Sequence, residues 1–235
     1  MSEMEQKQEK FRMSLVSGIL GCICFGVGIG FWVTSIPPPI GEDIFYFVCS
    51  GHGGGYDAWK IVVTLVMAMI GMCFLLPGMV CIANIVKGSG LRRLLRYLFT
   101  LCATGWIVIH FAVAVNVLVF SQAEKVGGQE LAVALSHSLS SACQLFLFCA
   151  YVFVAAALIT LIVLILQGKT RLKRRAALFT PAVPMGFIAL VSGLLPQSPF
   201  SYGLSTFCMN GGLIVWYGYL LRHQTIAIEE REDKR

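Results

Sequence analysis

The sequence predicts an all-α membrane protein, a helix bundle that crosses a bilayer six times with both termini in the cytoplasm. Hydrophobic residues make up 57% of the 235 residues and charged residues only 13%, about half the charged share of a soluble domain. The apolar residues fall into six blocks, each about twenty residues or longer, which is the helical length that spans a ~30 Å hydrocarbon core. The cationic residues gather on alternate connections between these blocks.

The six predicted spans form a single transmembrane domain, because only loops and tails remain outside them. Helices are required, since lipid cannot hydrogen-bond the backbone and each segment must satisfy its own amides. A transmembrane barrel would show ten-residue alternating stretches, and the sequence has none. The spans run approximately over residues 14–34, 58–86, 94–120, 140–166, 176–195 and 203–221.

The cationic residues predict the orientation. In the six-span arrangement, 16 of the 18 Lys and Arg residues lie on the side that holds both termini, and only Lys60 and Lys125 lie on the other. Cytoplasmic loops carry the Lys and Arg excess, so this side is predicted to be inside. The net charge of +6 therefore indicates contact with the lipid bilayer and its anionic headgroups rather than with nucleic acid.

The first span has a ladder of small residues spaced four apart. This spacing lets a second helix approach closely, which predicts tight packing inside the bundle or, alternatively, a homo-oligomer formed through this face. Residues 1–13 are expected to fray or to form a short surface helix. Ile19–Cys22 resembles a lipoprotein processing site, but the apolar run continues beyond it, so we expect the first helix to be retained. The ladder consists of Ser14, Gly18, Cys22, Gly26 and Gly30.

Proline and glycine residues predict kinks, breaks and turns along the rest of the chain. Pro77 predicts a kink in the second span. Gly127 and Gly128 predict a break, after which residues 129–140 are expected to extend the fourth span as a helix. The short turn at residues 196–199 predicts that spans five and six form an antiparallel hairpin.

The sequence predicts no catalytic residues, metal ligands or cofactor. Eight of the nine cysteines lie within predicted spans, Cys49 lies in a loop, and no metal-binding spacing occurs. Gly51–Gly55 resembles the oxyanion loop of some lipases, yet the chain has no GxSxG nucleophile motif. Two alternatives stay open, a cation site and an enzyme that acts on a lipid-like substrate. Either would use the ionisable groups of the loop at residues 35–57, which are Glu42, Asp43, His52 and Asp57.

Five polar side chains within the predicted spans are candidates for a site, and most of them lie in the outer half. Such residues usually face the bundle interior or a water-filled cavity. They could hydrogen-bond between helices, or they could line a pocket open to the outer face with His110 at its floor. A proton relay is disfavoured, because no Asp or Glu accompanies His110 at that depth. The candidate pocket residues are His110, Asn116, Gln144, Tyr151 and Asn210.

The last third of the chain resembles an uncharacterised family of bacterial six-span membrane proteins, a domain of unknown function. The resemblance implies the same architecture and a bacterial inner membrane, and it implies no reaction. The sequence departs from the family in lacking an acidic residue near the outer end of the first span. The residues that carry the resemblance are Pro181, Pro184, Leu195, Pro196, Gly203, Phe207, Asn210, Gly212 and Trp216, together with the small residues of the first span.

Three functional hypotheses follow. The leading one is a non-enzymatic inner-membrane protein that binds or moves a small apolar or amphipathic molecule, including a lipid, through the outer-half pocket. The second is a partner subunit or sensor component that acts through helix–helix contacts. The third is the enzyme on a lipid-like substrate.

Overall fold

All regular structure in the described part of the protein is helical. The computed structural model describes residues 3–33 and 57–223, so the loop features Glu42, Asp43, Cys49 and Gly51–Gly55 lie outside the described residues. The all-α fold class is confirmed within these limits. The elements in chain order are α1 (Glu3–Val33), α3 (Ala58–Ile82), η3 (Ala83–Ile85), α4 (Ser89–Leu166), η4 (Arg174–Phe179), α5 (Ala182–Leu194) and α6 (Pro199–Arg222).

Four helical stretches of the described chain are long and apolar enough to cross a membrane: Met4–Phe31, Trp59–Ile85, Ser89–Leu166 and Arg174–Leu194. The third stretch has 78 residues, which would measure about 117 Å at 1.5 Å per residue. A straight helix of that length would be far longer than the ~30 Å hydrocarbon core. The arrangement of α4 therefore decides how many crossings the chain can make.

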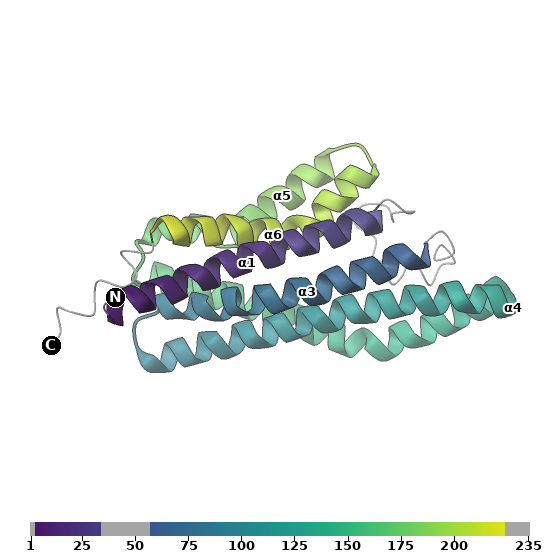
Figure 1. Ribbon diagram of the computed structural model, residues 1–235, viewed down its shortest axis with the longest axis horizontal. Helices are drawn as coiled ribbons and strands as arrows, with labels where there is room; N and C mark the ends of the chain where they lie inside the picture. Colours follow the sequence, from purple (N-terminus) through teal and green to yellow (C-terminus); the bar gives the residue numbers. More distant parts are fainter. Residues whose placement is uncertain (1–2, 34–56, 224–235) are drawn as a thin grey trace.

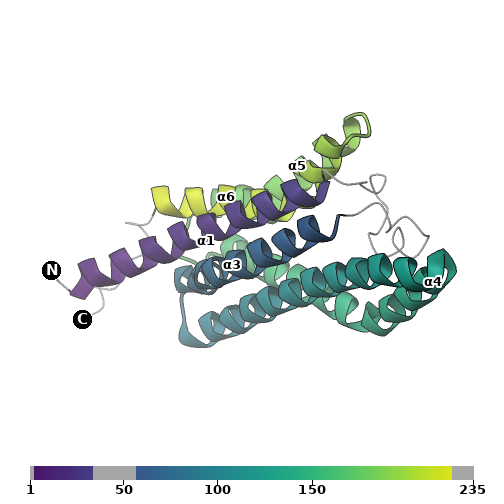
Figure 2. The same cartoon turned by 45° about the vertical axis from the view of Figure 1, so that its right-hand side comes forward.

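Helix α4 is a hairpin of two helical arms (Figures 1 and 2). Its backbone leaves helical geometry at Gly128, with φ 79° and ψ −179°, so the predicted break is confirmed at this residue. The arms contact each other along their length, because the backbone of Gly105 lies against Ala150. Nearer the tip, the Asn116 amide nitrogen donates to the Ser136 carbonyl at 3.4 Å and the Ser136 hydroxyl donates to the Asn116 side chain.

Helices α1 and α3 are packed through glycines. A Cβ placed on Gly78 would lie 2.6 Å from the Cα of Gly18, and one placed on Gly21 would lie 2.6 Å from the carbonyl oxygen of Gly71. The backbones thus approach so closely that no side chain fits between them, as small-residue helix packing requires. Helix α1 already begins at Glu3. The segment predicted to fray is therefore the continuous start of this helix.

The predicted span at 176–195 is divided in two. A 3₁₀ helix, η4, ends at Phe179, and α5 follows after Thr180 and Pro181. The reason is local, because a residue before proline is pushed out of helical conformation and proline itself suits a helix start. Thr180 accordingly has ψ 151°. Helix α5 packs against α6, which confirms the predicted contact between the last two apolar segments.

The two basic connections that follow α3 and α4 meet at one end of the bundle. The Lys87 amide donates to the Lys169 carbonyl and the Arg171 amide donates to the Ile85 carbonyl, both at 2.9 Å, around an antiparallel bridge between Val86 and Thr170. These hydrogen bonds hold two loops that are far apart in sequence side by side. Both loops therefore lie on the same side of any membrane that the bundle crosses.

The interior contains two clusters of buried apolar side chains. The larger joins α1, α3, α4 and α6 and includes Phe25, Ala68 and Met209. The smaller includes Ile29 and Ala114 and lies toward the α4 hairpin tip. The outer surface is also apolar, with Phe187 and Leu194 67% and 78% exposed, and such extensive apolar surface is suited to contact with lipid.

Candidate functional site

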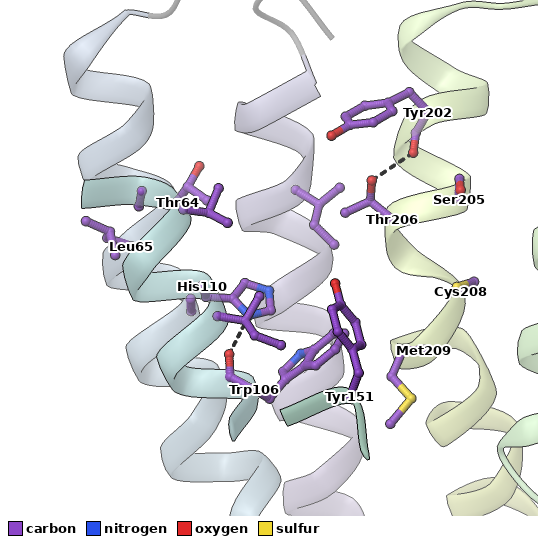
Figure 3. Close-up of a pocket in the computed structure, with 15 residues that line it drawn as sticks. Thr64, Leu65, Trp106, His110, Tyr151, Tyr202, Ser205, Thr206, Cys208 and Met209 are labelled. Atoms are coloured by element: carbon purple, nitrogen blue, oxygen red, sulfur yellow. Dashed lines mark hydrogen bonds between the residues drawn. The ribbon is translucent and has the colours of Figure 1, made fainter. Parts of the chain in front are cut away.

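A cavity of about 280 Å³ lies where the two apolar clusters meet (Figure 3). Helices α1, α3 and α6 and both arms of α4 contribute to its wall. Its lining includes Ile29 near the end of α1 and Tyr202 near the start of α6. The lining residues are Ile29, Thr64, Leu65, Ala68, Trp106, Ile109, His110, Val113, Ala114, Tyr151, Tyr202, Ser205, Thr206, Cys208 and Met209.

His110 is fixed in the cavity wall by its neighbours. Its Nδ1 lies 2.8 Å from the carbonyl oxygen of Trp106, and because a carbonyl can only accept, the proton is on Nδ1. A neutral imidazole with this tautomer presents Nε2 as an acceptor. The ring also contacts two aromatic rings, with its centroid 4.9 Å from that of Phe25 and 5.1 Å from that of Trp106.

Other polar groups of the cavity are uncharged. The indole nitrogen of Trp106 is buried and has no hydrogen-bond partner in the described residues, so its donor is unsatisfied beside the cavity. Thr64 donates within its own helix to the Lys60 carbonyl, at 2.9 Å, and Thr206 donates to the Tyr202 carbonyl at 3.0 Å. None of the described residues that line the cavity is Asp, Glu, Lys or Arg. The site is thus an apolar space with a few neutral hydrogen-bonding groups, as small-molecule sites commonly are.

The structure brings two of the five predicted pocket residues into this cavity. His110 and Tyr151 both line it, and Figure 3 shows their rings grouped with Trp106. Asn116 is 1% exposed and lies outside the cavity, because it joins the arms of α4 through Ser136. Gln144 is exposed on the outer face of the second arm. Asn210 is buried, but it does not line the cavity, and its amide has no hydrogen-bond partner in the described residues.

The small-residue ladder of α1 is mostly covered by the bundle. Gly18 packs on Tyr217 and Gly78, and Gly26 packs on Phe207. Cys22 is fully buried, whereas Gly30 has open space around it. Ser14 donates to the Lys10 carbonyl of its own helix at 3.0 Å. Most of this face is therefore used inside the monomer, and a homo-oligomer through it would have to displace α6.

The hydroxyl groups of α6 were missed by the sequence reasoning. Tyr202, Ser205 and Thr206 line the cavity, yet none of them is among the five residues predicted for the pocket. Their spacing contains the signal, because residues three and four apart share a helix face, and Met209 continues that face by three further residues. Thr64 was missed for the same reason.

No cluster of three metal-ligating side chains occurs among the described residues. Of the four ionisable loop residues considered for a cation site, only Asp57 is described, and it pairs with Lys60 at 3.0 Å. This ion pair is an ordinary contact in the first turn of α3.

Comparison with known proteins finds a matching family model. The model of a protein family described as a family of unknown function, DUF6796, matches residues 4–225. Neither the curated proteins nor the solved structures include a match to the chain. The cavity must therefore be interpreted from its own chemistry.

Proposed function

We propose that this chain, which belongs to the DUF6796 family of unknown function, is a six-span inner-membrane protein that binds a small, uncharged amphipathic molecule. The cavity around His110 and Tyr151 is the binding site. The protein acts as a binder or carrier of this molecule and performs no chemistry on it.

The arrangement of the helices supports six crossings with both termini in the cytoplasm. Each arm of α4 is longer than the roughly twenty residues that a crossing needs, and α6, with 24 residues, is also long enough. The loops at Val86 and Thr170 meet, as expected if the α4 hairpin crosses twice and returns to its starting side. These loops are rich in Lys and Arg, so that side is the cytoplasm.

One observation carries the binding proposal. The cavity is walled mainly by apolar and aromatic side chains, and it presents an acceptor on His110 without any charged residue among its described lining. A charged ligand would leave its charge unpaired in a low-dielectric site, which is costly. A neutral molecule with one polar end fits both the walls and the hydrogen-bonding groups.

Native mass spectrometry of the purified protein tests the proposal, combined with one cavity-filling variant. Ser205→Trp places a large ring in the cavity, whereas Val215→Trp places the same ring on the 41% exposed, outward face of the same helix. We expect the wild type and Val215→Trp to retain a small molecule that solvent extraction then identifies, and Ser205→Trp to lose it. Retention by Ser205→Trp, or no retained molecule in the wild type, contradicts the proposal.

A further inference from the structure

A second hollow lies on the other side of His110. It has a volume of about 510 Å³ and runs between α3 and the first arm of α4. Its described wall is almost wholly apolar, and several of its residues are exposed on the lipid-facing surface, including Met69 at 64% and Phe111 at 58%. We call this hollow the groove; it is lined by Phe25, Leu65, Ala68, Met69, Ile70, Met72, Cys73, Leu76, Ile107, His110 and Phe111.

The cavity and the groove share one thin wall. Leu65, Ala68 and His110 line both hollows. Phe25 lines only the groove and Trp106 lines only the cavity, and the His110 ring contacts both of these rings. Side chains of α1, α3 and α4 therefore meet in this wall, between the cavity with its several polar groups and the almost wholly apolar groove.

We propose that the two hollows hold one molecule, a neutral alcohol with a single hydrocarbon chain. Its hydroxyl lies in the cavity, and its chain passes the shared wall into the groove and on toward the bilayer. This assignment rests on the proposed function and names the class of its ligand.

The chemistry of the shared wall selects a hydroxyl. Nε2 of His110 accepts, so the ligand must donate. A hydroxyl supplies this donor, whereas a ketone or an ester lacks it. Apart from His110 of the shared wall and the weakly polar Cys73, every described residue that lines the groove is apolar, which favours a hydrocarbon occupant. Since lipid surrounds the groove, the fit of the chain contributes specificity more than hydrophobic affinity.

A photoreactive lipid tests this assignment in proteoliposomes that contain the full-length protein. The reagent is hexadecanol with a diazirine at the middle of its chain, and peptide mapping locates the label after illumination. We expect the label on residues 69–76 and 107–111. The same chain ending in a sulfate should label these residues about tenfold less, a difference of about 1.4 kcal/mol, because the described lining offers no cation to pair with the sulfate.

Two variants of α3 provide the matched comparison. Cys73→Trp fills the groove from an exposed position, and Val66→Trp adds the same ring on the 48% exposed surface outside the groove. We expect groove labelling to fall about tenfold in Cys73→Trp and to stay at the wild-type level in Val66→Trp. If Cys73→Trp does not fold, the comparison of alcohol and sulfate on the wild type still decides the question.

The possible failures are distinguishable. If Ser205→Trp loses the retained molecule while the alcohol and the sulfate label the groove equally, the cavity function stands and the two-hollow assignment is overturned. Labelling that Cys73→Trp leaves unchanged also overturns the assignment. If Ser205→Trp retains its molecule, the proposed function fails, and the assignment fails with it.

Discussion

The contact between α1 and α3 predicts that Gly21→Ala destabilises the protein. The added Cβ would lie 2.6 Å from the carbonyl oxygen of Gly71 and 2.6 Å from the amide nitrogen of Leu75. Ordinary van der Waals contact begins at 3.4 Å, so the contact is 0.8 Å too short. Both atoms belong to the backbone of α3, and no side-chain rotation can relieve the clash. The two helices must separate.

Overpacking of this kind costs about 1–3 kcal/mol, and it opposes the gain of up to ~1 kcal/mol that alanine brings to a helix over glycine. Gly30→Ala is the matched control in the same helix, because a Cβ there has nothing within 4 Å. Thermal unfolding in detergent, followed by tryptophan fluorescence, should show a Tm several degrees lower for Gly21→Ala, at about 2–4 °C per kcal/mol for a chain of this size. Equal Tm values for the two variants would refute the close helix approach.

Three further predictions concern polar and backbone features of the bundle. Asn116→Leu should lower stability by about 0.6–2 kcal/mol, because it removes both hydrogen bonds to Ser136. A double-mutant cycle with Ser136→Ala measures the coupling between the two side chains. Additive effects of the two substitutions would contradict the prediction. Asn210→Leu should leave the Tm unchanged or raise it, since the Asn210 amide has no hydrogen-bond partner in the described residues and loses none; a lower Tm would contradict this. Gly128→Ala should lower the free energy of unfolding by about 1–3 kcal/mol, because φ 79° with ψ −179° is essentially a glycine conformation. The control is Gly90→Ala, where a Cβ has open space and φ is not positive. It should leave stability unchanged in the same unfolding assay, and equal stability of the two variants would contradict the prediction.

Most of the fold follows from features that act along the chain. The length of an apolar block is set by the thickness of the bilayer, and the break at Gly128 follows from the conformational freedom of glycine. The division of the 176–195 segment could have been predicted too, because Pro181 forces Thr180 out of helical conformation. The packing of Gly21 on Gly71 could not, since it depends on which face of one helix meets which face of another.

The site was only partly predictable for the same reason. His110 was identified because it is the one ionisable side chain at its depth, and Tyr151 because its hydroxyl is polar. Asn116 was predicted either to line a pocket or to hydrogen-bond between helices, and it does the second, because α4 folds back on itself and brings Ser136 to it. The groove left no signal in the sequence, since its apolar wall resembles any lipid-facing surface.

Reporter fusions after Gly88, Gly128 and Gly168 test the six-span topology. With six spans, the fusions after Gly88 and Gly168 report the cytoplasm, where the two basic loops meet, and the fusion after Gly128 reports the opposite side of the membrane. A cytoplasmic report from Gly128 would mean that the α4 hairpin does not cross the bilayer, and it would contradict both the topology and the placement of the cavity within it.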